Sequence, residues 1–220
     1  MPILRHLIAA AAVALLPASA AMAELNLRVA FTEKQTRSGG IGGKRSTCTT
    51  EYVIKTLGPL LFLETAKSNC KTFRVGDLQG ADGSASAIVF EGRNSHSVKT
   101  CTYSAKSRTE RCNDGTKLRV PDGPKVDYKS RIDARSSYAL KKTSLTLSRK
   151  MARDLTTSKG SKQRTDAALE MRIVIQGKNC EVSTFKSTAQ SKVTAGPGKG
   201  SRLKESRQLV RSESCRVLSR

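Results

Sequence analysis

Six cysteines limit how this chain can fold more than any other feature of its sequence. They are Cys48, Cys70, Cys101, Cys112, Cys180 and Cys215. An even number of cysteines in an exported chain predicts disulfides rather than free thiols. None of the spacings is C-x-x-C, and His96 is the only histidine after residue 6. A zinc site is therefore poorly supported, and we expect no bound metal and no cofactor.

The cysteines fall into consecutive pairs that each straddle a turn signal. The first pair centres on Pro59, the second on the polar residues Lys106 and Ser107, and the third on Gly196–Gly200. Directly opposed residues of an antiparallel hairpin bring their Cβ atoms close enough for a disulfide. The sequence therefore predicts the disulfides Cys48–Cys70, Cys101–Cys112 and Cys180–Cys215, although six cysteines allow many other pairings.

The N-terminus has the order of a secretory signal peptide. Arg5 and His6 precede an uncharged run, Leu7–Leu16, and Ala21–Ala23 forms a small-x-small cleavage site. We expect residues 1–23 to be removed and the mature chain to be periplasmic or secreted. The alternatives are cleavage after Ala20 and an uncleaved anchor. No later segment is apolar enough for a transmembrane span.

Strand-like alternation and frequent turn signals define the expected fold class. Leu25, Leu27, Val29 and Phe31 share one face of an extended segment, and the stretch Leu169–Ile175 repeats the pattern. We expect a mainly β, antiparallel sandwich or barrel-like domain, braced by up to three disulfides.

Domain boundaries and connecting segments follow from the turn signals and the charge pattern. We expect one domain over 24–220, with 121–124 as the alternative boundary between two lobes. The predicted loops are 38–46, 76–86 and 156–165. Apolar residues fall on even positions at Tyr138 and Leu140 and on odd positions at Leu145 and Leu147, a change that a bulge at Lys141–Lys142 would explain. The segment 201–220 fits either a helix or a strand.

Positive charge is concentrated in the second half of the chain. The net charge of the chain is +22, and residues 116–220 hold 25 Lys and Arg against 9 Asp and Glu. Dense stretches include 125–135, 159–164 and 202–211. Such a field attracts polyanions. The candidates outside the cytoplasm are lipopolysaccharide, acidic polysaccharide, anionic lipid and extracellular DNA.

The predicted polyanion contacts are the cations around one expected hairpin, Tyr138–Ile175. They are Lys141, Lys142, Arg149, Lys150, Arg153, Lys159, Lys162 and Arg164. Few aromatic residues accompany them, so no sequence-specific nucleic-acid binding is expected.

No catalytic motif stands out from the background. Gly39–Lys44 lacks the spacing and the following hydroxyl residue of a phosphate-binding loop. His96 lies in a polar turn-like stretch, and no catalytic residue is predicted. We therefore expect a non-enzymatic binding protein. The alternatives are a hydrolase with carboxylate chemistry and a protein-binding module such as an inhibitor or adhesin subunit.

Overall fold

The computed structural model describes residues 24–39, 43–70, 87–92, 94–120 and 123–219. Within these ranges twelve strands form one antiparallel sheet, so the expected mainly β, antiparallel fold is confirmed. The strands are β1 (Asn26–Ser38), β2 (Lys44–Leu57), β3 (Leu60–Ser68), β4 (Ala87–Glu91), β5 (Asn94–Ser104), β6 (Thr109–Cys112), β7 (Lys117–Arg119), β8 (Tyr128–Lys141), β9 (Ser144–Thr157), β10 (Lys162–Gln176), β11 (Asn179–Ala195) and β12 (Arg202–Ser219). None of the described residues belongs to a helix that could cross a membrane.

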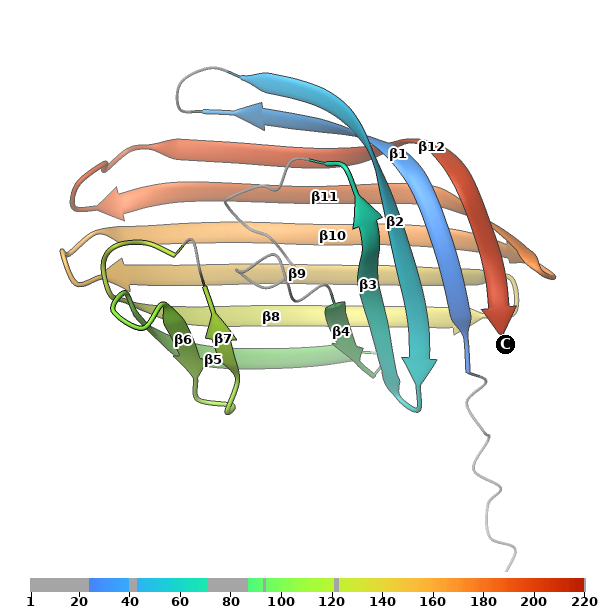
Figure 1. The fold of residues 1–220 in the computed structure, drawn as a ribbon, viewed down its shortest axis with the longest axis horizontal. Coiled ribbons are helices and arrows are strands. Elements are labelled where there is room, and N and C mark those ends of the chain that lie inside the picture. The colour runs from blue at the N-terminus through green and yellow to red at the C-terminus, as the bar shows by residue number, and fades with distance from the viewer. Residues whose placement is uncertain (1–23, 40–42, 71–86, 93, 121–122, 220) are drawn as a thin grey trace, which may run out of the picture.

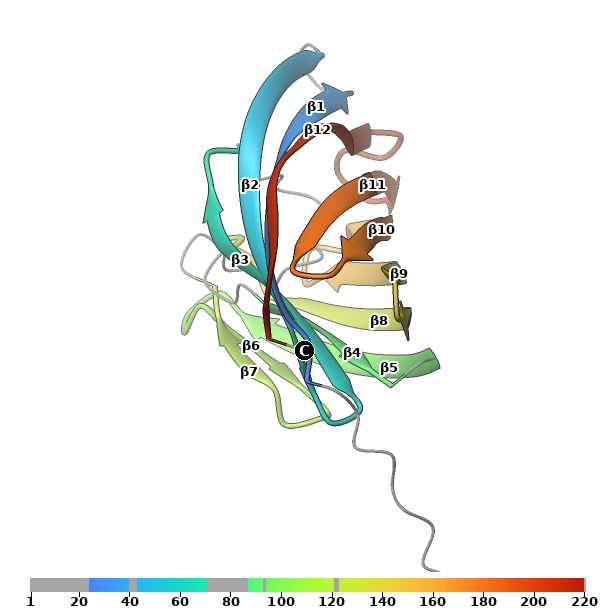
Figure 2. The same ribbon diagram turned by 90° about the vertical axis from the view of Figure 1, so that its right-hand side faces the viewer.

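The sheet folds over itself into two layers. Its strand order is β4-β3-β2-β1-β12-β11-β10-β9-β8-β5-β6-β7, so the first and last strands of the chain pair in its interior. Figure 1 shows β8–β11 running across the back, while β2 and β3 cross in front of them. In the turned view of Figure 2 the two layers separate, and β1, β2 and β12 curve from one layer into the other.

Irregular pairing accompanies this bend. The register between β1 and β12 shifts at Ala30/Phe31 and again at Thr32/Glu33. Each shift adds a local bend and increases the twist of the strand. Strands that pass from one layer to the next through such bends are typical of orthogonally packed sheets.

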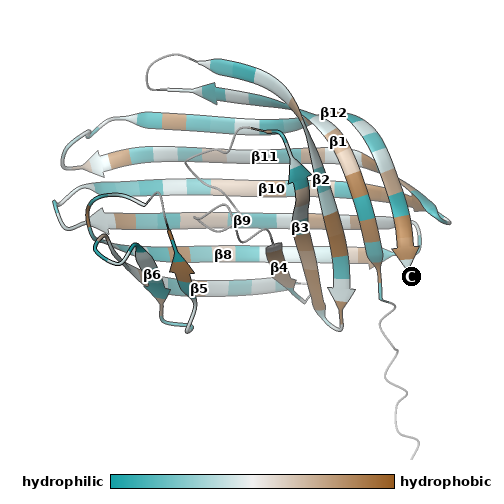
Figure 3. Cartoon of the chain, in the orientation of Figure 1, coloured by the Kyte–Doolittle hydropathy of each residue, from teal (hydrophilic) through white to brown (hydrophobic). Residues whose placement is uncertain are grey.

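An apolar core fills the space between the two layers. It takes Leu27, Val29 and Phe31 from β1, and Leu145 and Ile173 from the back layer, all of which are fully buried. Figure 3 shows hydrophobic residues concentrated on the lower halves of β1, β2 and β3. Because successive strand residues alternate between faces, this inward set leaves the polar residues on the outer face.

All three predicted disulfides are present: Cys48–Cys70, Cys101–Cys112 and Cys180–Cys215. Cys101 and Cys112 lie directly opposite each other in the β5–β6 ladder. The Cys180–Cys215 bridge spans the part of β11 and β12 where regular pairing is interrupted, between Asn179 and Lys186. This disulfide therefore holds the two strands together where backbone hydrogen bonds are lost.

Several local expectations require correction. Lys141–Lys142 is not a bulge, because β8 ends at Lys141 and β9 begins at Ser144 after a tight turn. The turn reverses the chain, which explains the change of phase. The segment 156–165 is mostly strand with a short turn in its middle, and 202–219 is a strand rather than a helix.

Some predicted segments lie partly or wholly outside the described residues. Strands from both sides of 121–124 belong to the same sheet, since β5 pairs with β8. Strand β1 continues to Ser38 and β2 begins at Lys44, so the loop expected over 38–46 is shorter. The predicted signal peptide, 1–23, and the predicted loop 76–86 lie outside the described residues.

A second, smaller core lies under β5–β7. It contains Tyr103, Val120 and Tyr128, and the rings of Tyr103 and Tyr128 stack with their centroids 4.6 Å apart. Burial raises the pKa of the Tyr128 hydroxyl to about 12, from an ordinary value of 10.0.

The raised pKa of Tyr128 predicts a stability change at high pH. The folded state favours the neutral phenol, so this stabilisation is complete below pH 10 and is lost as the pH rises from 10 towards about 12. A near-ultraviolet absorbance titration should show a late tyrosine ionisation that Tyr128→Phe removes. If that variant only reduced an ionisation centred near pH 10, the described burial would be contradicted.

Candidate functional site

The eight predicted contact residues do not share one surface. Inward positions of β9 are odd-numbered, as the buried Leu145 and Leu147 show. Arg149 and Arg153 share this parity and therefore point between the layers, whereas Lys150 is exposed on the outer face. Arg149 donates a hydrogen bond from Nη1 to the carbonyl oxygen of Val89 at 3.3 Å. Burial lowers the pKa of its guanidinium.

Arg153 takes part in a buried ion pair instead of a surface contact. Its Nη2 lies 2.7 Å from Oε1 of Glu110, whose side chain is almost fully buried. The guanidinium also lies over the ring of Tyr128, 5.4 Å from the centroid, and donates to the Ser130 hydroxyl. Placing Arg149 and Arg153 among surface contacts overlooked their parity with the apolar residues of the same strand.

The other six predicted residues are exposed but separated. Lys141 and Lys142 lie at the β8–β9 turn, and Lys159 lies at the β9–β10 turn, at the opposite end of β9. A strand of this length spans about 45 Å. Lys150, Lys162 and Arg164 occupy outer-face positions between these turns.

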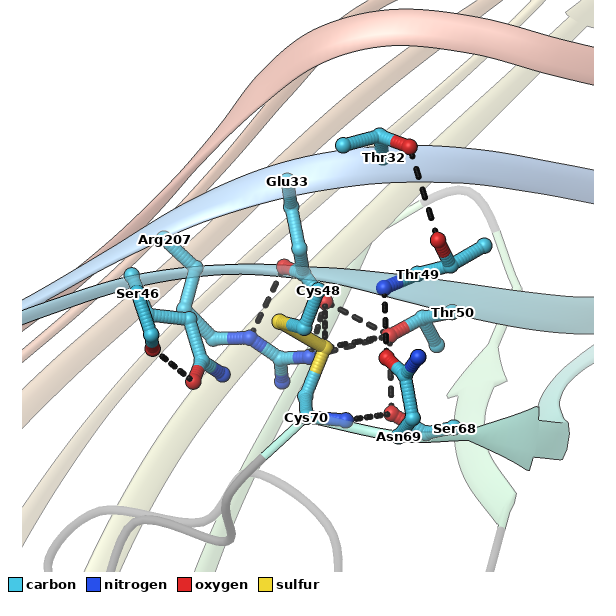
Figure 4. A network of polar contacts seen from close by, with 11 residues as sticks. Thr32, Glu33, Ser46, Cys48, Thr49, Thr50, Ser68, Asn69, Cys70 and Arg207 are labelled. Atoms are coloured by element: carbon cyan, nitrogen blue, oxygen red, sulfur yellow. Dashed lines mark hydrogen bonds and ion pairs between the residues drawn. A yellow bond between two sulfur atoms is a disulfide. The ribbon is translucent and has the colours of Figure 1, made fainter.

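A second buried ion pair joins β1 to β12. Glu33 is fully buried, and the guanidinium of Arg207 contacts both of its carboxylate oxygens. Arg207 Nε donates to Glu33 Oε2 at 2.8 Å. Thr50 donates to Glu33 Oε1 at 2.6 Å. Figure 4 shows these side chains meeting beside the Cys48–Cys70 disulfide. Because the carboxylate oxygens of Glu33 accept from residues of both β2 and β12, the cluster is suited to stabilising the bend of the sheet.

Two of the buried glutamates, Glu33 and Glu110, lie beside cysteine sulfurs, an arrangement that could suggest a metal site. Glu33 groups with Cys48 and Cys70, and Glu110 groups with Cys101 and Cys112. In each group the two sulfurs are bonded to each other. Disulfide sulfurs are not thiolates, and thiolate is the form of cysteine that binds metals.

A groove of about 710 Å³ with polar lining lies on the outer face of the back layer. We call it the outer-face groove. It crosses six neighbouring strands, from β8 to β1, or roughly 24 Å at the usual strand spacing. Its outward-facing lining residues are Thr36, Ser38, Asp133, Arg135, Lys150, Ala152, Asp166, Ala168, Thr188, Gln190, Lys204 and Ser206.

Strand register explains why this surface is hollowed. Lys150 pairs with Ala168, Ala168 with Thr188, and Thr188 with Ser206, so one row across the sheet is mostly small. The next row also lines the groove and holds Ala152, Asp166, Gln190 and Lys204 in register. The surface is therefore low where small side chains of the two rows lie together.

A row of cations borders the groove. Arg164 pairs in register with Lys192, and Lys192 pairs with Arg202, while Arg131 lies opposite Asp154 on the neighbouring strand pair. Arg131, Lys192 and Arg202 are exposed. Arg164 is bridged to Asp154 and Asp166, at 3.3 and 3.2 Å, which raise the pKa of its guanidinium. Inside the groove, Arg135, Lys150 and Lys204 add further positive charge.

Of the predicted contacts, Lys150 lines the groove and Arg164 lies in the adjoining row. The prediction did not include Arg131, Arg135, Lys192, Arg202 or Lys204. Residues that pair in a hairpin are equally distant from the centre of its turn, which is how the cysteine pairs were predicted. The same rule, applied to the turns between β8 and β12, aligns these cations across the sheet. The signal was present, because 125–135 and 202–211 are among the densest basic stretches.

One candidate for acid–base chemistry lies at the end of the groove. His96 Nε2 is 3.0 Å from Oδ1 of Asp133, and both residues are partly exposed. Among the described residues, no hydrogen bond joins the His96 ring to a serine, threonine or cysteine side chain. The arrangement therefore lacks the activated nucleophile that covalent hydrolysis requires.

Comparison with known proteins adds no function. The chain matches no protein-family model, and no curated protein or solved structure is significantly similar to it.

The opposite orientations of neighbouring β9 residues can be tested by stability. Arg153→Met leaves Glu110 buried without its cation, so we expect a loss of about 3 kcal/mol in the free energy of unfolding. Lys150→Met, at an exposed position, should change it by less than about 0.5 kcal/mol. Denaturant unfolding measures both.

A third variant controls for packing. Adding Glu110→Gln to Arg153→Met removes the uncompensated charge and should restore part of the loss. Equal effects of the two single substitutions would show that Arg153 is not in the interior.

Proposed function

We propose that this chain is an exported, non-enzymatic binding protein whose outer-face groove holds an extended anionic polymer. The observation that carries the proposal is that Arg135, Lys150 and Lys204 all line one groove that crosses six strands. Arg135 and Lys150 pair in register on β8 and β9, and Lys204 lies on β12. The row formed by Arg131, Lys192 and Arg202 runs beside it. Together they present cations at intervals set by strand spacing.

Charge and shape both support a linear ligand. Arg164, Lys192 and Arg202 occupy three successive strands of the row beside the groove, so their backbone positions lie about 4.8 Å apart. A flexible polyanion can place successive charges along such a row, releasing the counterions that it had condensed. The backbone of the groove is held in the paired strands of the sheet, so ligand binding orders side chains but little backbone.

Export is supported by two independent features. The first is the signal-like order of residues 1–23. The second is that all six cysteines are paired in disulfides, which persist in oxidising compartments.

Neutralising the groove should weaken polyanion binding. Arg135, Lys150 and Lys204, all replaced by Gln, remove three exposed contacts worth up to about 1 kcal/mol each, so heparin affinity at low salt should fall roughly ten- to a hundredfold. The slope of log K against log salt should become shallower by about two to three. Titration calorimetry at several salt concentrations measures both quantities.

A matched variant separates the groove from total charge. Lys67, Lys117 and Arg119 are exposed on β3 and β7 and do not line the groove. Replacing these three by Gln removes the same charge and should reduce affinity less than threefold. Equal losses in the two triple variants, or no heparin binding by the native protein, would refute the proposal.

A further inference from the structure

The groove contains acceptors as well as cations. Asp133 and Asp166 line it together with Gln190 and the hydroxyls of Thr188 and Ser206. In strand register, Asp133 and Asp166 both lie opposite Ala152, so the two carboxylates flank a small residue. A site for phosphates alone gains nothing from carboxylates in its lining.

Both carboxylates keep acceptor capacity towards a ligand. His96 contacts Oδ1 of Asp133 at 3.0 Å, and Arg164 contacts both oxygens of Asp166, at 3.2 and 3.4 Å from its Nε. A carboxylate has about four lone-pair sites, so one partner leaves room for others. Sugar hydroxyls can donate to these oxygens in charge-assisted hydrogen bonds, which are stronger than neutral ones. A phosphate placed there would meet like charge instead.

The groove also lacks the groups that single-stranded nucleic acids use. Its described lining includes no Phe, Tyr or Trp. Base stacking on aromatic rings supplies much of the sequence-tolerant binding energy for single strands. An unstacked strand would rely on phosphate contacts and would encounter Asp133 and Asp166 among them.

We propose that the ligand class of the outer-face groove is an acidic polysaccharide, a chain that carries carboxylate or sulfate groups and free hydroxyls. This inference rests on the proposed function. Arg135, Lys150 and Lys204 bind the anionic groups of the glycan. Asp133, Asp166 and Thr188 accept hydrogen bonds from its hydroxyls.

The test compares two probes of equal charge. An oligogalacturonate and an oligothymidylate with the same number of negative groups are titrated into the native protein in the same buffer. We expect the oligogalacturonate to bind about tenfold tighter, from hydrogen bonds gained and like-charge contacts avoided.

One substitution with a matched control locates the selectivity. Asp166→Asn removes a groove carboxylate and one of the two ion pairs of Arg164, so thymidylate binding should strengthen and the preference should shrink at least threefold. Asp154→Asn removes the other ion pair of the same arginine but lies outside the groove lining. It should strengthen binding of both probes alike and leave their ratio within about a factor of two.

A hydroxyl variant gives an independent readout. Thr188→Val removes one groove hydroxyl with little change of shape, and it should weaken oligogalacturonate binding about threefold without affecting thymidylate. Thr184→Val, on the same strand outside the groove lining, should change neither.

The outcomes separate this inference from the function on which it rests. Equal or tighter binding of thymidylate, with both probes weakened by loss of Arg135, Lys150 and Lys204, would overturn the polysaccharide assignment and leave polyanion binding intact. If neither probe bound at low salt, both would be overturned.

Discussion

The pairing of β1 with β12 holds the two layers of this molecule together. The ladder runs from Asn26 opposite Ser219 to Ser38 opposite Lys204, so it begins in one layer and ends in the other. Two register shifts bend it near Phe31, where the Phe31 and Phe185 rings lie 4.7 Å apart. The Glu33–Arg207 ion pair lies just beyond these rings, with Arg207 5.9 Å above Phe185. An ion pair at this point fixes which residues oppose each other across the bend, since a shift of register would leave Glu33 buried without its cation.

The same alternation that builds the core also builds the basic face. Leu169, Met171 and Ile173 point inward from β10, which forces Arg164, Asp166 and Ala168 onto the outer face. A slip of one residue would exchange the two sets. The face on which the cations of β8–β12 lie is therefore set by the burial of their neighbours along each strand. For the same reason, a surface substitution such as one at Lys150 can alter ligand binding while the sheet remains intact.

Much of the fold could be predicted from the sequence because its turns are marked by glycine and proline. The turn at Gly58–Pro59 and the one over Gly196–Gly200 located the centres of two hairpins, and the cysteine pairs followed from them. The turn at Lys142–Thr143 carries no such mark, so the change of phase there was interpreted as a bulge. The orientation of Arg153 was missed because its partner, Glu110, is 43 residues away and belongs to a different hairpin. The groove depends on register across six strands, which composition and charge density do not encode.

A rigid sheet and a flexible cationic tail would recognise polyanions in different ways. A tail adapts to any spacing of negative charge, and its selectivity is correspondingly low. Here the strand spacing fixes the distances between cations, and Asp133 and Asp166 interrupt them at set positions. An interrupted cation row penalises a ligand whose charges are continuous, while a ligand that alternates charge with hydrogen-bond donors can use every position. In the proposed function, the acidic residues within the basic groove limit the range of anionic ligands that the sheet's large positive charge attracts.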